Sequence, residues 1–477
     1  MYRELEKKAN FHKALWGVLF VCWAYWIFLY FTSSMVLVYD AQVFETIGRR
    51  IYAEGWKAFF IQGPSREPLY PFMIATSMKL GEIFSVPYQT FQTAFQILFL
   101  FSTQVLLLLI FSELKISRRV QLCVLLYFGI SPAVVNAAFS LYSEIATFPF
   151  VLAGVFSMYY AWRHIDQKSL KKIVLYALCS AIFFLGAAFA KAIFQYIFAV
   201  LLVPFVVLIG RAYFKRSRKV LTATAVYVLV ASVTLGAAVI EYRYLNKIYN
   251  GVFDFTDRYD GNLYGNVSKR TRKLTPARFW AHFVSVPGGG VCRKFFDEET
   301  CRFCEFYYMD LYRFQELLPI LQQTPKDQHS AKTISLAVEK LAKNPLQYLF
   351  LTFMESLKMA FWESTQVGFV LYPPFLDSLY KSTVFKDSLR FTVSFLTYVS
   401  LFYAFFFVVH NRARLLDTRS EKNKTVQMCF FVLMAIVPFT GLYALFSILT
   451  RFAFPIVSLY FICFALWADR MLRKYDL

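Results

Sequence analysis

Five ionisable residues lie beside long apolar stretches of this sequence, where charge is unusual. Asp40 directly follows one apolar run, Glu144 begins another, and Lys191 lies at the turn of an apolar hairpin. Arg66 lies in a proline-rich segment, and Arg451 precedes the last apolar run. Ionisable groups near membrane depth are costly and usually mark a functional site. A carboxylate can accept a proton from a hydroxyl, and a cation can stabilise developing negative charge. Together, these residue types suit a reaction in which a carboxylate acts as a general base and cations stabilise a nearby anion.

Each residue also has a purely structural interpretation. Asp40 or Glu144 can cap the N-terminus of a helix. Lys191 and Arg451 can be basic anchors whose long side chains reach the membrane surface. Because all of them are expected at the same face of the membrane, the set as a whole favours a site.

The elements that must position these residues are transmembrane helices. Of 477 residues, 58% are hydrophobic, whereas soluble chains are about 45–50% apolar. The excess falls in uncharged blocks of roughly 18–25 residues, the length that crosses the hydrocarbon core. Backbone groups cannot stay unpaired in lipid, so these blocks are expected to be helices. The sequence therefore predicts an all-α polytopic membrane protein.

The net charge of +21, from 51 Lys and Arg against 30 Asp and Glu, would suggest nucleic acid in a soluble protein. Here most basic residues lie in short segments between apolar blocks, which is the positive-inside pattern. No nucleic-acid-binding motif accompanies them, so we expect no nucleic-acid partner.

Charge asymmetry predicts about ten spans with both ends cytoplasmic. The first run, 14–38, is expected to be a retained span because it is too long for a signal-peptide core. The runs at 68–84 and 346–362 contain charges; we expect both to lie in the outer interface. Three regions result: an N-terminal transmembrane module with a first outer loop at 40–87, a large outer loop with an interfacial helix, and C-terminal transmembrane helices. Their bounds are 1–240, 241–387 and 388–477. Function is expected on the outer face, where the substantial loops lie.

Three of the eight cysteines, Cys292, Cys301 and Cys304, share the large loop. In an oxidising compartment they would form one disulfide and leave one free thiol, with the pairing open. A zinc site that also uses His282 is the alternative, but no well-spaced fourth ligand is evident.

The order of these motifs resembles the GT-C glycosyltransferases that use polyprenyl-phosphate sugars, particularly the branch of protein O-mannosyltransferases and lipid A aminoarabinose transferases. The helix-like stretch 40–55 and the segment Arg66-Glu-Pro-Leu-Tyr-Pro71 are similar to that family's first outer loop. Ser143-Glu144, Lys191 and Arg451-Phe-Ala-Phe-Pro455 resemble its later motifs in the same order. Ala41 and Thr450 stand where the family often has acidic residues.

The resemblance implies a GT-C-like bundle that transfers a sugar from a polyprenyl phosphate, such as undecaprenyl phosphate, with inversion. Asp40 would be the catalytic base, with Glu144 orienting the acceptor or sharing the proton. Lys191, Arg451 and Arg66 would bind the donor phosphate. The acceptor would be lipid A of lipopolysaccharide, another envelope glycan or glycolipid, or a protein, and we prefer a bacterial inner membrane with a periplasmic site.

A basic run in the large loop is the predicted acceptor-binding site, because it can contact phosphates on a lipid acceptor. It comprises Lys269, Arg270, Arg272 and Lys273; the alternative is a solvated loop face.

Two other functions remain open. A flippase for lipid-linked sugars would place charges along a path near the bilayer midplane, and a glycan ligase would use a pyrophosphate-linked donor. A divalent metal requirement also stays open, since no ligand cluster is evident.

Overall fold

The computed structural model describes residues 2–61, 63, 66–165, 169–256, 259–325, 328–363, 368–417, 420–446 and 449–474. Residues 62, 64 and 65 of the predicted first outer loop lie outside these ranges.

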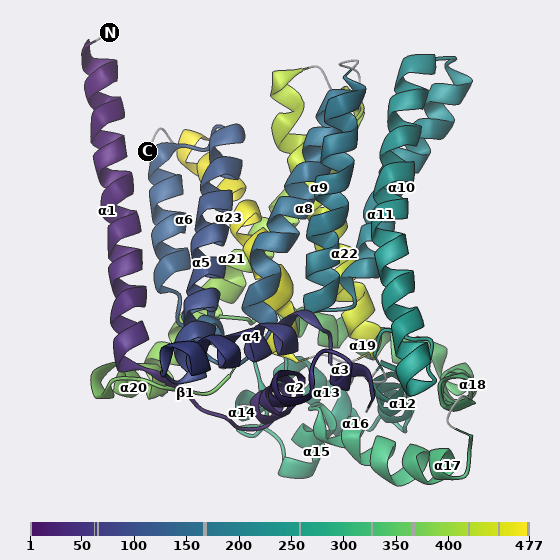
Figure 1. Cartoon of the computed structure of the whole chain (residues 1–477). Helices are drawn as coiled ribbons and strands as arrows, with labels where there is room; N and C mark the ends of the chain where they lie inside the picture. The colour runs from purple at the N-terminus through teal and green to yellow at the C-terminus, as the bar shows by residue number, and fades with distance from the viewer. Residues whose placement is uncertain are drawn as a thin grey trace.

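Long apolar helices form an upright bundle (Figure 1). Within the described ranges, nine helices are long and apolar enough to cross a membrane. They are α1 (Tyr2–Thr32), α5 (Tyr88–Glu113), α8 (Glu144–His164), α9 (Leu170–Ala190), α10 (Phe194–Phe214), α11 (Arg218–Asn250), α21 (Thr383–His410), α22 (Lys424–Phe446) and α23 (Phe454–Lys474). The bent pair α6 (Arg118–Ile130) and α7 (Pro132–Phe139) is a tenth candidate. The prediction of an all-α, multi-pass membrane protein is confirmed.

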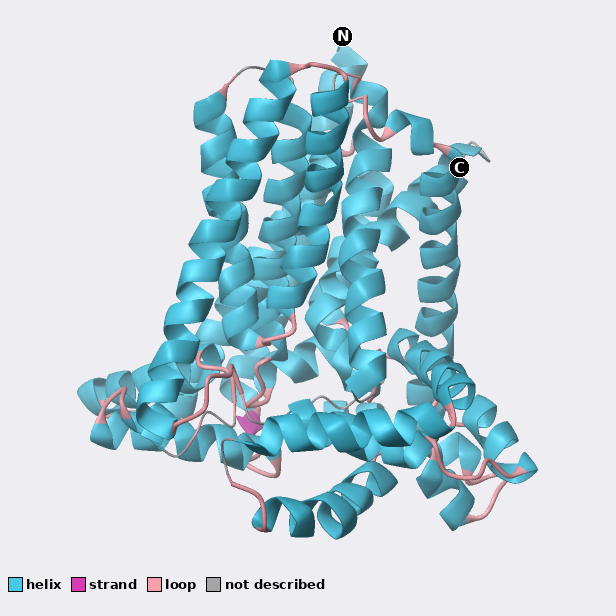
Figure 2. Cartoon of the chain, turned by 90° about the vertical axis from the view of Figure 1, so that its right-hand side faces the viewer, coloured by secondary structure: helices cyan, strands magenta, loops and turns pink. Residues whose placement is uncertain are grey.

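Short helices form a layer at one end of the bundle, and both termini lie at the other end (Figures 1 and 2). From the first loop come α2 (Asp40–Glu54), α3 (Ala58–Ile61) and α4 (Leu69–Phe84). The large segment supplies α12 (Tyr259–Arg270), α13 (Pro276–Val284), α14 (Gly289–Cys292), α15 (Glu298–Phe303), α16 (Tyr307–Tyr312), the π-helical turn η2 (Arg313–Leu317), α17 (Leu318–Gln322), α18 (His329–Lys343), α19 (Pro345–Ser356), the 3-10 turn η4 (Leu357–Ala360) and α20 (Pro374–Lys381). Neither α4 nor α19 is among the candidate spans.

A two-stranded antiparallel sheet, with two residues in each strand, joins the link between α1 and α2 to the end of the large segment. Strand β1 (Ser34–Met35) follows α1 and pairs with β2 (Val370–Leu371). The amide of Val36 also donates to the carbonyl of Phe369 at 2.9 Å. This pairing fixes the position of the chain segment that leads into α2.

The two most buried spans carry site residues at their ends. About four-fifths of the apolar stretch of α8 and of α23 lies inside the bundle, at 83% and 78%. The hydroxyl of Thr147 in α8 lies 2.7 Å from the carbonyl of Glu144 in its own helix and 3.2 Å from the carbonyl of Pro455 in α23. This shared contact joins the start of α8 to the start of α23. Glu144 and Arg451 are thereby brought to the same end.

Gly129 lies where α6 packs closely against α1. A Cβ atom added there would lie 2.1 Å from Sγ of Cys22, and Trp26 donates to the Gly129 carbonyl at 2.7 Å. We expect Gly129→Val to force α1 away from α6 and to destabilise the fold by about 1–3 kcal/mol, as overpacking does. Thermal unfolding of purified protein in detergent should show a lower Tm.

Gly236→Val is the matched control, because nothing lies within 4 Å of a Cβ added at Gly236 in α11. An equal loss of Tm in both variants would contradict the packing argument.

Candidate functional site

The five residues predicted to bind donor or catalyse transfer line one cavity of about 350 Å³. Asp40 and Glu144 are the first residues of α2 and α8. Lys191 follows the last residue of α9, and Arg451 lies in the 3-10 turn η7 (Thr450–Ala453) before α23. Arg66 comes from the link between α3 and α4. Five separate chain segments therefore converge at the layer end of the bundle.

The chain reaches Asp40 through a sharp turn. Tyr39 has a φ of 51°, a conformation that residues other than glycine rarely adopt and that is often found at functional sites. This turn starts α2 with an acidic residue, and negative charge is favourable at a helix N-terminus. The helix then buries one face against the bundle, through Phe44, Ile47 and Ile51.

Asp40 forms ion pairs with two arginines. Its Oδ1 accepts from Arg66, and its Oδ2 accepts from Nη2 of Arg451 at 2.7 Å. Burial raises the pKa of the Asp40 carboxyl, but the charges of Arg66 and Arg451 outweigh burial and hold that pKa below its ordinary value. Asp40 is therefore ionised at neutral pH.

Glu144 forms the second ion pair, with Lys191. Nζ of Lys191 donates to Oε1 of Glu144 at 3.1 Å, and both side chains are mostly buried. Within the described residues, Oε2 of Glu144 is buried without a hydrogen-bond partner. A buried carboxylate oxygen of this kind is available to accept a proton or to bind a hydroxyl.

Glu67 is a third carboxylate of the cavity, and the predicted site did not include it. Its Oε1 accepts from the backbone amide of Ala192 at 3.2 Å. This bond ties the segment after α3 to the turn that carries Lys191. Glu67 thus helps to position two of the cations, Arg66 and Lys191.

Aromatic rings and polar groups complete the wall. Arg66 lies over the ring of Phe44 at 5.0 Å, and Arg451 lies over Tyr142 at 5.5 Å. The large segment also contributes lining residues that sequence reasoning did not single out. They are Thr256, Asn262, Phe306, Asp310, Arg313 and Phe314.

The predicted acceptor-binding run does not line this cavity. Lys269 and Arg270 are buried, and both bind Glu355, at 2.9 and 2.6 Å. Arg272 is half-exposed and pairs with Glu316, and Lys273 is exposed. The helix α12 ends at Arg270 with its last two side chains buried, and Arg272 and Lys273 lie beyond its end, where they are accessible to solvent.

Burial and paired charge determine the ionisation of this inner cluster. Burial raises the pKa of Glu355, but Arg270 and Lys269 outweigh it and hold that pKa well below its ordinary value. Burial also lowers the pKa of His282 to about 4. The cluster is therefore a structural ion-pair centre of the large segment.

Removing the Glu355 charge should destabilise the protein. Glu355→Gln leaves two buried cations without compensation, a change that typically costs about 3–5 kcal/mol. Because the folded pKa lies below the unfolded value, the carboxylate contributes stability above that unfolded pKa and loses it as pH falls. We expect a lower Tm for Glu355→Gln at pH 7 and a smaller difference from the wild type near pH 3.

The control for this prediction is Glu339→Gln, which removes one partner of an exposed pair with Lys343 at 3.6 Å. An exposed ion pair of this kind contributes little to the free energy of unfolding. A pH-independent difference between Glu355→Gln and the wild type would contradict the assignment.

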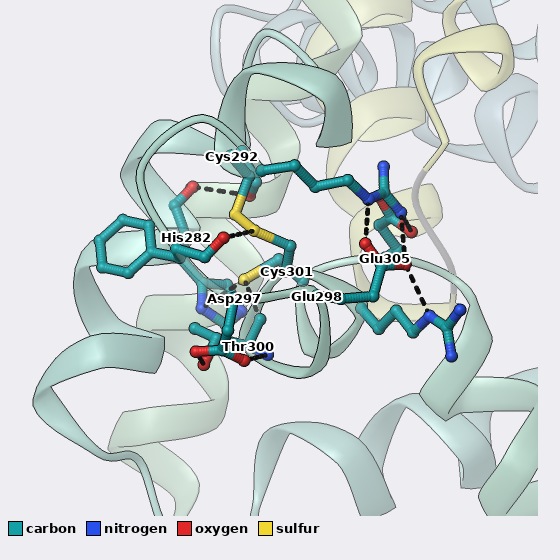
Figure 3. Close-up of a disulfide and its surroundings, with 12 residues drawn as sticks. His282, Cys292, Asp297, Glu298, Thr300, Cys301 and Glu305 are labelled. Atoms are coloured by element: carbon teal, nitrogen blue, oxygen red, sulfur yellow. Dashed lines mark hydrogen bonds and ion pairs between the residues drawn. A yellow bond between two sulfur atoms is a disulfide. The ribbon is translucent and has the colours of Figure 1, made fainter.

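The disulfide of the large segment joins Cys292 to Cys301 and leaves Cys304 as a buried free thiol (Figure 3). The expectation of one disulfide and one free thiol is confirmed. Burial raises the pKa of the Cys304 thiol to about 11, so it stays protonated and unreactive. Its Sγ lies 3.4 Å from Nδ1 of His282.

The pairing of Cys292 with Cys301 takes two of the candidate zinc ligands. In the part of the chain that the structure describes, no group of three or more His, Cys, Asp or Glu side chains is arranged to hold a metal ion. The alternative of a zinc site with His282 therefore lacks a ligand set in these residues.

A larger cavity of about 470 Å³ lies beside the β1–β2 sheet and includes the buried Glu363. That carboxylate accepts from Tyr127, Ser131 and the amide of Ala133 at the start of α7. It therefore stabilises the bend between α6 and α7. We place the candidate site in the smaller cavity, where opposite charges converge.

Comparison with profiles of known protein families and with curated protein sequences finds no match.

Proposed function

We propose that this protein is a membrane glycosyltransferase of the GT-C type. It would move a sugar from a polyprenyl phosphate to a hydroxyl or phosphate acceptor, with inversion. The observation that carries the proposal is one cavity at the end of a helical bundle in which two ion-paired carboxylates meet three cations. A lipid-linked donor can reach such a position from the membrane, and its phosphate is the group that the cations suit.

The ion pairs indicate how donor binding prepares the site. Arg451 is bound to Asp40, and Lys191 is bound to Glu144. A donor phosphate attracts both cations and competes with the two carboxylates for them. Each carboxylate then has an oxygen free to accept a proton, and each cation is aimed at the leaving group.

The transfer step then needs a base for the acceptor proton and groups that stabilise the charge of the departing phosphate. The acceptor oxygen attacks the anomeric carbon as the bond from that carbon to the phosphate oxygen breaks, and the bonding electrons leave with the phosphate. Asp40 takes the hydroxyl proton, with Glu144 orienting the acceptor or sharing the proton. Positive charge develops on the sugar and negative charge on the phosphate, where Lys191, Arg451 and Arg66 stabilise it.

The proposed location is a bacterial inner membrane, with the site facing the periplasm. The large segment contains a disulfide, and disulfides persist in oxidising compartments. The charged cavity also lies at one end of the bundle, which favours transfer at a membrane face over passage of a substrate through the midplane, as a flippase requires.

Asp40→Asn should lower sugar transfer by about 10²–10⁴-fold, the usual contribution of a general base. Binding of donor should be largely retained, because Lys191, Arg451 and Arg66 all remain. Purified protein in nanodiscs, with labelled polyprenyl-phosphate sugar and an envelope lipid extract, gives both measurements.

Glu54→Gln is the control on the same helix, because Glu54 is exposed at the end of α2. Full transfer activity in Asp40→Asn would overturn the assigned base.

The proposed orientation predicts which loops can be labelled from outside the cell. In a variant that lacks the native free cysteines, Lys273→Cys should react with a membrane-impermeant maleimide in spheroplasts. Lys215→Cys should react only after permeabilisation, because it follows α10 at the end that holds both termini; both positions are exposed. The reverse pattern would place the cavity in the cytoplasm.

A further inference from the structure

Two sets of polar groups in the charged cavity differ in how they are paired. In the set that comes from the first loop and the bundle, Asp40 and Glu144 are joined to Arg66, Arg451 and Lys191 in ion pairs. In the set that comes from the large segment, the side chains of Asn262, Asp310 and Arg313 also line the cavity. Within the described residues, none of these three side chains has a hydrogen bond or a close ion pair to the protein. Asp310 and Arg313 attract one another electrostatically, and Arg313 lies over the ring of Phe314 at 5.8 Å. Their hydrogen-bonding capacity is therefore directed at whatever fills the cavity.

Thr256 adds an independent observation to this wall. Its side chain is buried, at 3% exposure, and its hydroxyl has no hydrogen-bond partner in the described part of the chain. Buried hydroxyls are normally bonded, so an unbonded one at a cavity wall points to a ligand group.

The backbone supports a defined position for Arg313. It is the first residue of the π-helical turn η2, between α16 and α17, and such turns occur frequently at functional sites. The guanidinium lies against α12 at a glycine, where a Cβ added to Gly261 would be 2.9 Å from Nε of Arg313. Asp310 lies three residues earlier, so it shares a face with Arg313. Burial raises the pKa of the Asp310 carboxyl.

The chemistry of this wall suits a polyhydroxylated ring. A carboxylate, an amide, a guanidinium and a hydroxyl offer both acceptors and donors in one place. On this wall the negative charge of Asp310 offsets the positive charge of Arg313, which favours a neutral polar group over a phosphate. A lipid tail would leave all four groups unpaired. Phe306 and Phe314 add aromatic faces beside them. The cavity volume of about 350 Å³ falls in the range of small-molecule sites.

We propose that Thr256, Asn262, Asp310 and Arg313 form the subsite for the transferred sugar, in the same cavity as the cations that bind the donor phosphate. This inference rests on the proposed function, because the sugar is the polar part of the proposed donor. Specificity for the sugar then resides in the large segment, whereas the bundle side performs the transfer.

Equilibrium binding by the full-length protein in nanodiscs tests this subsite. The probes are undecaprenyl phosphate and its glucose, mannose and 4-aminoarabinose derivatives. Arg313→Ala and Asp310→Asn should each lower the affinity for the preferred sugar-bearing probe by about tenfold or more. Each substitution removes a hydrogen bond to or from a charged group. Undecaprenyl phosphate alone should bind as it does to the wild type.

Arg302→Ala is the matched control, since Arg302 lies in the same segment, is exposed and pairs with Glu298 at 2.8 Å. Thermal unfolding checks that each variant is folded, and Arg313→Lys serves in place of any Arg313→Ala protein that is not. Unchanged affinity for the sugar-bearing probe, or an equal loss for the sugar-free one, would overturn the subsite.

Failure of the proposed function has a different signature. A wild type that binds the sugar-bearing probe through these residues but transfers no sugar would overturn the transferase and leave the subsite standing. A wild type that binds none of the probes would overturn both.

Discussion

The site depends on the attraction between Asp40 and two arginines at the end of the bundle. Arg66 lies 26 residues from Asp40, and Arg451 lies 411 residues away. One carboxylate therefore joins the start of α2, the link before α4 and the turn before α23. Removing any of these charges from water is costly, and the two arginines are compensated because Asp40 lies within hydrogen-bond distance of both.

The second pair extends this constraint to the middle of the chain. Glu144 and Lys191 connect the start of α8 to the turn between α9 and α10, and Glu67 connects that turn to the segment of Arg66. The spans are thus tied together at the same end at which the cavity opens. The charges that hold the helices in place are the ones that we propose for donor binding and catalysis. The same residues would therefore serve both the fold and the reaction.

The large segment divides into a structural part and a part that faces the cavity. Glu355 with its buried cations and the Cys292–Cys301 disulfide form the interior of the structural part. Asp310 and Arg313 belong to the other part, and both line the cavity. A stable interior allows the cavity wall to hold its polar groups in position, as a preorganised binding site requires.

The sequence alone determined the class of the protein and five members of the charged set. The length of an apolar run and the charges that border it are local properties, and lipid constrains them strongly; the helical spans, the short α4 and the five boundary residues could therefore be recognised in advance. Tertiary structure alone decided which charges pair, which cysteines join and which basic residues are buried. Lys269 and Lys273 look equivalent in sequence, yet α12 buries the first against Glu355 and ends before the second. The wall of Asn262, Asp310 and Arg313 left no sequence signal, because pairing and burial depend on contacts between distant segments, which local composition does not encode.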